Sequence, residues 1–312
     1  KKLGFNCTEV SKYTGTKEIL GGRVKTLHPK IHAGILSKRN NRSHIADLKN
    51  NNFKEIDLVI VNFYPFEKVL NNSNKHSEIV ENIDIGGPTM VRAASKNYKD
   101  VTVITNIDQY KDLSNELNFN KGFTSLNFRE KMSKFAFNAV THYDSIIANY
   151  FNRRSNDNFP RKKIIVGNLV EKLRYGENPH QEAAIYSESE NININQISGK
   201  KLSYNNYNDI FSALLVSKSL PKNIGTVIVK HSNPCGVSIN KNNLKSYKLA
   251  LACDPVSAFG GIVSCNFRIK KKLALELNKI FLEVIICNGI DIDALKILKR
   301  KKKSKNNRCK KF

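Results

Sequence analysis

Two polar segments in the second half of the chain could carry chemistry. An apolar run at residues 226–229 ends in Lys230 and His231 and continues as Ser-Asn-Pro-Cys-Gly. Histidine is well suited to proton transfer near neutral pH, and a neighbouring cation can stabilise a developing oxyanion. Cys235 is an alternative nucleophile, but a small cysteine in a turn is more often a packing residue.

The second segment, residues 173–181 (LRYGENPHQ), is costly to bury without partners, so it predicts a surface loop or a polar site.

The first half of the chain holds two segments that suit an anion. Residues 21–29 (GGRVKTLHP) combine glycines, an Arg fork, a Lys charge and a Thr hydroxyl, which fits a phosphate as well as it fits a polar surface turn. Residues 81–87 (ENIDIGG) lead into a predicted helix that carries Arg92 and Lys96, and a helix N-terminus after paired glycines offers free N–H groups. Asp84 could cap that helix, which is the commoner role, or accept hydrogen bonds from a substrate.

The segments that must position these residues alternate between strand and helix patterns, which predicts an α/β class. A polar stretch with a proline at residues 152–163 indicates a domain boundary. The Lys-rich residues 299–312 indicate a solvated, mobile basic end. The expected strands are residues 56–63, 101–105 and 226–229, and the expected helices are residues 77–83, 86–97, 128–150 and about 209–219.

Composition limits the classes of protein. A chain of 312 residues is long for one hydrophobic core, so two domains are expected. Its 40% hydrophobic and 25% charged residues exclude a wholly disordered or collagen-like chain. The apolar runs fall short of the ~20 residues that a membrane-spanning helix needs. No secretion signal is visible and the six cysteines form no CxxC pair, so we expect reduced thiols in a cytoplasmic protein.

Net charge and histidine spacing could indicate a nucleic acid or a metal ion, but neither is expected. The formal net charge of +25 falls to +15 without the ten basic residues in the last 17 positions. The remaining basic residues are spread along an Asn- and Ile-rich chain, so specific nucleic-acid binding is not expected. His28 and His32 are four residues apart, but Pro29 between them argues against a continuous helix, and we predict no metal site.

Taken together, several long segments resemble one family, the bifunctional phosphoribosylaminoimidazolecarboxamide (AICAR) formyltransferase/IMP cyclohydrolase of de novo purine synthesis. The motifs occur in the family's order, which argues against a chance resemblance. Three segments resemble the cyclohydrolase half of the family, namely GRVKTLHPKIHAGIL (residues 22–36), VNFYPF (61–66) and ENIDIGGPTMVRAASKNYKDV (81–101). Four segments resemble the formyltransferase half, namely LRYGENPHQ (173–181), LSYNN (202–206), VIVKHSNPCGVS (227–238) and DPVSAFGGIV (254–263).

The resemblance implies transfer of a formyl group from 10-formyltetrahydrofolate to the 5-amino group of AICAR. His231 matches the family's catalytic histidine, and Lys230 matches the lysine that stabilises the transition state. The other matching positions are substrate contacts, namely Arg174 and Tyr175, which hold the ribotide, and Asn206, Gly260 and Glu283.

The resemblance also implies dehydrative ring closure of formyl-AICAR to IMP. Such an intramolecular step is accelerated largely by holding the reacting groups together. Lys96 is the main candidate for polarisation or proton transfer, with Lys25, Tyr64 and Asp84 as the other candidates. The positions that match nucleotide contacts are Arg23, Val24, Lys25, Thr26, Val61, Asn62, Tyr64, Asp84 and Ile85.

The implied fold is a methylglyoxal-synthase-like domain at residues 1–151, a linker at 152–163, the first part of a cytidine-deaminase-like formyltransferase domain at 164–298, and a basic tail at 299–312. The zinc of the deaminases is not implied, because the His and Cys spacing for it is absent, and the chemistry needs no metal. The implied co-substrate is 10-formyltetrahydrofolate. The implied partners are AICAR, formyl-AICAR and IMP together with a second copy in a homodimer, and no membrane.

Family members extend beyond both ends of this chain, so we expect a form truncated at both ends. It would lack the N-terminal phosphate-binding loops and the second lobe of the formyltransferase domain. The alternative is a catalytically inactive fragment that binds polyanions nonspecifically through its basic tail. Steep salt-dependent DNA binding without turnover would favour that alternative.

Overall fold

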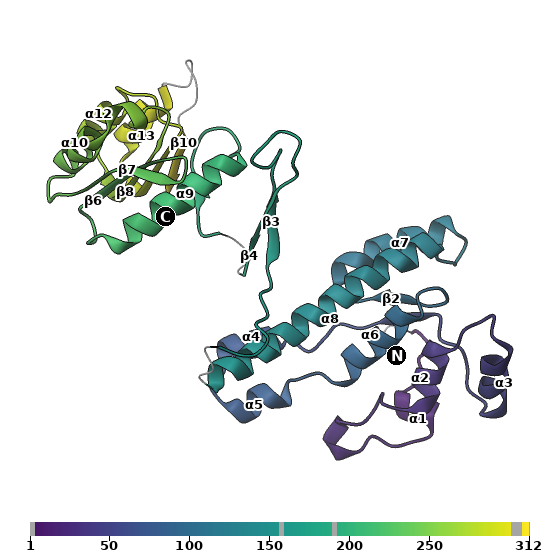
Figure 1. The fold of residues 1–312 in the computed structure, drawn as a ribbon. Coiled ribbons are helices and arrows are strands. Elements are labelled where there is room, and N and C mark those ends of the chain that lie inside the picture. Colours follow the sequence, from purple (N-terminus) through teal and green to yellow (C-terminus); the bar gives the residue numbers. More distant parts are fainter. Residues whose placement is uncertain (1–3, 156–158, 189–191, 301–307, 312) are drawn as a thin grey trace. The chain divides into compact units, whose positions relative to one another are not determined.

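Apolar runs of the sequence become strands at the centre of separate sheets (Figure 1). By its internal contacts the chain divides into two units, Lys1–Ile165 and Val166–Phe312, and each is described by itself. The computed structural model describes residues 4–155, 159–188, 192–300 and 308–311.

The first unit is built around two parallel strands, β1 and β2, which pair from Leu58 with Thr102 to Ile60 with Ile104. All three residues of β2 are buried, because helices pack on it from several sides. The elements of this unit are α1 (Val10–Thr14), the 3-10 turn η1 (Leu20–Gly22), α2 (Pro29–Leu36), α3 (Arg42–Asn50), β1 (Leu58–Ile60), α4 (Phe66–Asn72), α5 (His76–Glu81), α6 (Gly86–Lys96), β2 (Thr102–Ile104), the 3-10 turn η2 (Ile107–Gln109), α7 (Tyr110–Phe119) and α8 (Leu126–Arg154).

Helices α6 and α8 bury regularly spaced apolar side chains. Val91 and Ala94 of α6 face the core, whereas Arg92 lies on the exposed side of that helix. Pro88 lies in the first turn of α6, where its missing N–H leaves no intrahelical bond unmade. Along α8 the buried positions recur every three or four residues, which is the period of a helix with one core-facing side. These positions of α8 are Phe128, Met132, Ala136, Val140 and Tyr143.

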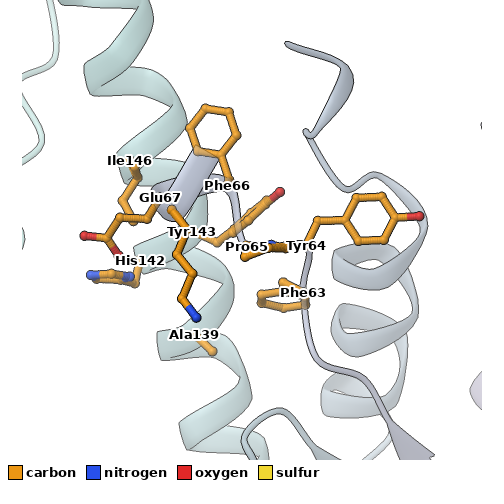
Figure 2. A pocket seen from close by; sticks show the side chains of 10 residues that line it. Phe63, Tyr64, Pro65, Phe66, Glu67, Ala139, His142, Tyr143 and Ile146 are labelled. Carbon is orange, nitrogen blue, oxygen red and sulfur yellow. The ribbon is translucent and has the colours of Figure 1, made fainter. Parts of the chain in front are cut away.

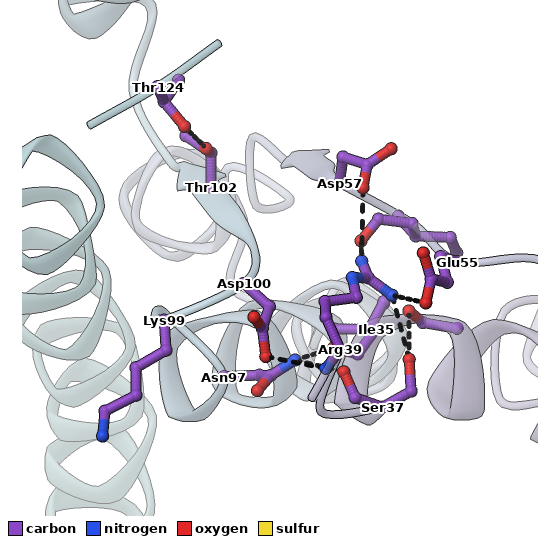
Figure 3. Close-up of polar contacts among 12 residues, drawn as sticks. Ile35, Ser37, Arg39, Glu55, Asp57, Asn97, Lys99, Asp100, Thr102 and Thr124 are labelled. Atoms are coloured by element: carbon purple, nitrogen blue, oxygen red, sulfur yellow. Dashed lines mark hydrogen bonds and ion pairs between the residues drawn. The ribbon is translucent and has the colours of Figure 1, made fainter. Parts of the chain in front are cut away.

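Arg39 connects the loop after α2 to the segment that enters β1 (Figure 3). Its guanidinium donates to the carbonyl oxygen of Ile56 at 2.9 Å and forms ion pairs with Glu55 and Asp57 at 3.4 and 3.3 Å. Its backbone N–H donates to a carboxylate oxygen of Asp100 at 3.3 Å. The Arg39 side chain is only 20% exposed, so these contacts replace most of its hydration and fix the start of the sheet.

Asn97, just beyond α6, supplies the second polar connection in this region (Figure 3). Its Nδ2 donates at 2.9 Å to the carbonyl oxygens of both Ile35 and Ser37, at the C-terminal end of α2. The last carbonyls of a helix have no intrahelical donor, and Asn97 is buried, so the amide satisfies groups that water does not reach.

Replacing Asn97 with Ala should therefore destabilise the first unit. Two buried carbonyls lose their donor. We expect this loss to lower the free energy of local unfolding of α2 and α6 by about 2–3 kcal/mol. Hydrogen exchange of peptides from α2 and α6, followed by mass spectrometry, measures this unfolding. Asn71→Ala, at an exposed position of α4, is the matched control and should change the same quantity by less than about 0.5 kcal/mol.

The second unit contains a mixed six-stranded sheet with the order β5-β10-β9-β8-β6-β7 and a separate two-stranded ribbon, β3-β4. Strand β6 is antiparallel to both of its neighbours, and β8, β9 and β10 are parallel to one another. The C-terminal end of β6 therefore lies beside the N-terminal end of β8, at the same edge of the sheet as the N-terminal end of β9. The strands are β3 (Asn168–Lys172), β4 (Ala184–Ser187), β5 (Asn195–Gln196), β6 (Gly225–Lys230), β7 (Asn233–Ile239), β8 (Ile262–Ile269), β9 (Val284–Ile290) and β10 (Arg308–Lys311).

Alternate residues of β6 face two different cores. Val227 and Val229 pack with buried residues of α9, whereas Ile228 packs with residues of α10, α11, α12 and α13. Because successive side chains of a strand point to opposite faces, the continuous apolar run predicts a strand covered on both sides. The helices of this unit are α9 (Tyr204–Ser219), α10 (Asn243–Cys253), α11 (Pro255–Ala258), α12 (Lys271–Leu277) and α13 (Ile292–Arg300).

The structure confirms the α/β class and the expected strands and helices, but it moves some boundaries. Helix α9 begins at Tyr204 rather than near Asp209, because Ser203 and Asn206 form a capping box at its start. Helix α8 continues to Arg154, inside the stretch that was expected to be a linker. Residues 308–311 pair as β10 with β9 and β5, whereas composition alone indicated a solvated end. No helix in the described part of the chain is long and apolar enough to cross a membrane.

Candidate functional site

A cavity of about 580 Å³ in the first unit gathers most of the residues predicted for ring closure. It lies where η1 and the segment before α2 meet the start of α6 and the segment after β1. Its charged lining residues are two cations, Arg23 and Lys25, and three carboxylates, Glu18, Glu81 and Asp84. The predicted residues that line it are Arg23, Lys25, Thr26, Val61, Asn62, Tyr64, Asp84 and Ile85.

Asp84 links the start of α6 to the cavity. One carboxylate oxygen accepts the backbone N–H of Gly87 at 2.8 Å, and the other accepts the N–H of Tyr64 at 3.4 Å. Its own backbone N–H donates to the Tyr143 hydroxyl at 2.8 Å. Burial raises the pKa of Tyr143, so that hydroxyl stays neutral and accepts this bond near neutral pH. Asp84 therefore caps the helix and lines the cavity at once.

The paired glycines allow close contact at the same helix start. A Cβ atom added to Gly86 would lie 2.5 Å from the hydroxyl oxygen of Thr26, and one added to Gly87 would lie 2.5 Å from a carboxylate oxygen of Asp84. Both distances are shorter than any ordinary contact, so larger residues would push the Thr26 and Asp84 side chains out of position. The Gly-Gly pair thus lets the Thr26 hydroxyl and the Asp84 carboxylate lie close to the start of α6.

Both cations of the cavity are paired with carboxylates of the chain. The Arg23 guanidinium donates to both carboxylate oxygens of Glu81, and the Lys25 ammonium lies 3.2 Å from Glu18. The contact with Arg23 holds the pKa of Glu81 below its usual value, and the same contact raises the pKa of Arg23. An anionic ligand must therefore compete with Glu81 and Glu18 for these cations.

Two predicted residues of this half lie away from the cavity lining. Val24 is half-buried and pairs with Ile19 in an isolated antiparallel bridge. Lys96 is exposed at the last residue of α6, whereas the cavity lies at the first residues, Gly86 and Gly87. At 1.5 Å of rise per residue, ten residues separate the two ends of this helix by about 15 Å. The role of Lys96 stays a prediction, and the structure does not bring this residue to the cavity within one chain.

A smaller cavity of about 320 Å³ lies between α8 and the segment that follows β1 (Figure 2). Phe63, Tyr64 and Pro65 line it from that segment, and His142 and Tyr143 line it from α8. Tyr64 lines both cavities, and Tyr143 bonds to the Asp84 N–H, so the two cavities share one wall.

In the second unit, Lys230 and His231 lie at the turn between β6 and β7. Lys230 pairs with Asn233, so His231 and Ser232 form a two-residue hairpin loop. The Lys230 ammonium donates to the carbonyl oxygen of Phe259 at 2.9 Å, which directs it toward the loop before β8. His231 is exposed, so a ligand can reach its imidazole.

Three further predicted residues lie at this edge of the sheet. Gly260 follows Phe259 directly, and its N–H donates to the carbonyl oxygen of Phe281 at 2.8 Å. Gly260 has a φ of +75°, a conformation that favours glycine. The amide of Asn206, at the start of α9, donates to the carboxylate of Glu283, just before β9. The structure thus joins Asn206 to Glu283 directly, although the two are 77 residues apart in the sequence.

Arg174 and Tyr175 occupy the loop after β3, with the guanidinium 5.8 Å from the centre of the Tyr175 ring. The adjacent Leu173 packs against the core on the α9 side of the large sheet. Within the described ranges, no hydrogen bond or ion pair joins Arg174 or Tyr175 to Lys230 or His231. Their role in holding a ribotide stays a prediction.

Cys235 is arranged as a structural residue. Its thiol donates to the carbonyl oxygen of Ile228 at 3.6 Å, and burial raises its pKa, which disfavours the nucleophilic thiolate. The next residue, Gly236, faces α10 so closely that an added Cβ would lie 1.9 Å from the carbonyl oxygen of Ala250. Cys235 and Gly236 therefore serve packing, whereas His231 is exposed and Lys230 is half-buried.

Several residues at these sites were not singled out from the sequence. Tyr143 showed only the spacing of a core residue on a long helix, and Glu18 had no motif around it. Glu81 lay within a quoted motif, but its pairing with Arg23 joins residues 58 positions apart. Asp209, on α9, accepts the backbone N–H of Ser232 at 2.7 Å. Among the described residues, no group of three or more His, Cys, Asp or Glu side chains is placed to hold a metal ion.

Comparison with known proteins finds two family models that match successive parts of the chain. The family model described as "AICARFT/IMPCHase bienzyme" matches residues 94–310, and the one described as "MGS-like domain" matches residues 1–89. The chain belongs to the AICARFT/IMPCHase bienzyme family. The methylglyoxal-synthase-like first part and the family predicted from the motifs are therefore confirmed.

The curated relatives of this bienzyme family carry the name "Bifunctional purine biosynthesis protein PurH". The protein of Rippkaea orientalis is 44% identical over 309 residues, which are 96% of this chain and 60% of that protein. The protein of Acetivibrio thermocellus is 45% identical over 306 residues, 96% of this chain and 59% of that protein. A solved structure described as "Crystal structure of ForH" matches 48% of this chain and 78% of its own chain, with 29% identity and a TM-score of 0.43. This chain thus spans about 60% of the length of the curated relatives it matches.

Glu81→Gln should strengthen anion binding in the larger cavity, because the substitution frees Arg23 from its carboxylate partner. An exposed ion pair contributes little in water, so we expect a gain of about two- to fivefold in affinity for inorganic phosphate, measured by titration calorimetry. Glu130→Gln, which removes an exposed carboxylate on α8, is the control for the change in net charge. Equal gains in both variants would mean that the ion pair does not compete with the anion.

Proposed function

We propose that this chain carries out chemistry of the last two steps of IMP synthesis, which are formylation of AICAR and ring closure of the product. The observation that carries the proposal is the match of the bienzyme family over residues 94–310, preceded by the MGS-like match over residues 1–89. The two groups of predicted residues lie in different units of the chain, which supports two separate sites.

In the proposed formyl transfer, the 5-amino group of AICAR attacks the formyl carbon of 10-formyltetrahydrofolate. That amine is a weak nucleophile, because its lone pair is delocalised into the ring and the carboxamide. His231 would accept the amine proton as the C–N bond forms, and Lys230 would stabilise the oxyanion of the tetrahedral adduct. Breakdown of the adduct returns the carbonyl, and tetrahydrofolate leaves with a proton. The proposed chemistry uses no metal ion.

In the proposed ring closure, the carboxamide nitrogen of formyl-AICAR attacks the formyl carbon, and the adduct loses water to give IMP. The cavity supports this step by its polar lining, because Arg23, Lys25 and Thr26 suit the phosphate of a nucleotide. Asp84 and Tyr64 lie at the same wall and would orient or polarise the carboxamide. Holding the two reacting groups in contact would supply much of the acceleration.

Other parts of the proposal rest on the sequence. The resemblance implies the co-substrate 10-formyltetrahydrofolate, the substrate contacts at Arg174, Tyr175, Asn206, Gly260 and Glu283, and a homodimer. The cysteine pattern and the polar stretch at residues 152–163 support a cytoplasmic location and a first domain ending near residue 151. An assay of this 312-residue chain for each step separately, with and without a supplied C-terminal segment of a PurH relative, tests the proposal. If neither step shows turnover, with or without that segment, the proposal is contradicted.

His231→Ala should separate the two activities. Loss of the proton acceptor should lower kcat for formyl transfer by about 10²- to 10⁴-fold and leave ring closure unchanged. Asp84→Asn, which keeps an oxygen for the Gly87 N–H, is the reciprocal variant and should slow only ring closure. Spectrophotometric assays of AICAR formylation and of IMP formation measure the two rates. Parallel loss of both activities in either variant would contradict separate sites.

Lys25 and Lys96 should differ in their effect on ring closure. Lys25 lines the cavity, whereas Lys96 lies at the other end of α6, so Lys25→Met should slow the step more than Lys96→Met does. We expect the Lys25 variant to lose at least about tenfold in kcat/KM, because a cation stabilises a bound nucleotide and its reacting groups only over a short distance. A greater loss in the Lys96 variant would support the role implied by the resemblance and contradict this geometric argument.

A further inference from the structure

The loop that carries His231 has an unfavourable backbone conformation for its residues. His231 and Ser232 have φ values of +52° and +62°, both in the left-handed region. Two-residue hairpin loops of this kind need positive φ at both positions, which Asn-Gly or Gly-Gly adopt easily. Neither residue here is glycine, and serine in particular is rarely found in this region. Some other interaction must therefore stabilise the loop.

That interaction comes from Asp209 on α9. A carboxylate oxygen of Asp209 accepts the backbone N–H of Ser232 at 2.7 Å, a short, charge-assisted hydrogen bond across 23 residues of sequence. Within the loop itself, the Asn233 amide donates to the carbonyl oxygen of His231 at 3.0 Å. The first bond ties the loop to another element, whereas the second acts only inside the loop.

Helix α9 is a rigid base for this contact. Its N-terminus is closed by the capping box of Ser203 and Asn206, and Ile210, next to Asp209, is fully buried in the core. Asp209 is half-buried, so its carboxylate is partly shielded from water where it meets the loop. The same helix start places Asn206 against Glu283. Any shift of α9 would therefore move the loop and the predicted substrate contact together.

We propose that Asp209 is the positioning residue for His231. Its carboxylate holds Ser232 in the left-handed conformation, and this keeps the hairpin loop in the form that presents the imidazole beside Lys230. Asp209 acts through the backbone of Ser232 and not on the substrate. The catalytic meaning of the proposal rests on the proposed formyl transfer, but the conformational claim can be measured without it.

The experiment compares four variants of the full chain: Asp209→Ala, Asp209→Asn, the double variant Asp209→Ala with Ser232→Gly, and Asn208→Ala as the control. Asn208 is the exposed neighbour of Asp209 on the same helix. The amide shift of Ser232 and the HN–Hα couplings of residues 231 and 232, measured by NMR, report the loop conformation. The kcat and KM of AICAR formylation report its consequence.

In Asp209→Ala we expect the couplings to move away from left-handed values and kcat to fall about 10- to 100-fold, because a small misplacement of a reacting group is costly. The KM for AICAR should change less than about twofold. Asp209→Asn keeps an acceptor oxygen and should retain most of the activity. Glycine adopts the left-handed region without strain, so Ser232→Gly should restore the loop and most of kcat in the Asp209→Ala background. A defect caused only by loss of helix stability would not be restored in this way.

Native couplings and native kcat in Asp209→Ala would overturn the proposal, as would failure of Ser232→Gly to restore either quantity. An equal loss in Asn208→Ala would also overturn it, because the effect would then belong to the helix as a whole. If the native chain forms no formylated product, the proposed function fails for this chain, and the NMR couplings alone decide the role of Asp209.

Discussion

Polar side chains at the ends of strands and helices must be held by partners from elsewhere in the chain, and both candidate sites depend on this constraint. Lys230 is held by the carbonyl of Phe259, Arg23 by Glu81, and Lys25 by Glu18. A long cationic side chain loses rotamer freedom when it is fixed, and an oxygen acceptor offsets that loss. These acceptors direct the cations within the chain, and an anionic ligand would compete with them.

The two sites use different backbone structures to position their polar groups. The cavity of the first unit uses the start of a helix, where Asp84 satisfies the Gly87 N–H and paired glycines admit Thr26 and Asp84 closely. The second unit uses a hairpin loop at the edge of a sheet, where left-handed residues bring the chain back sharply. In both cases the strained or crowded element rests on a well-packed support, α6 on α8 in one unit and β6 on α9 in the other. Rigid packing beneath a polar group helps to give that group a defined direction.

Much of the local structure could be predicted because it depends on residues close in sequence. The apolar run before Lys230 predicted β6, and the Gly-Gly-Pro sequence at residues 86–88 predicted the start of α6. The sequence predictions were wrong where the end or the pairing of an element depends on a contact that has no periodic pattern in the sequence. The start of α9 depends on the side chain of Ser203, and pairing of residues 308–311 depends on the open edge of β9, which composition does not reveal. Capping and edge pairing depend on a few hydrogen bonds each and leave almost no periodic signal in the sequence.

The sequence by itself determined the family, the α/β class, and the residue types available for each chemistry. These follow from long motifs and from hydrophobic periodicity, which are both properties of neighbouring residues. Only the tertiary structure decided that Arg23 meets Glu81, that Asn206 meets Glu283, that Asp209 holds Ser232, and that Lys96 lies at the far end of its helix from the cavity. The physical reason is that each such contact is a single short-range interaction between distant segments, and its geometry exists only after the sheets and helices have packed.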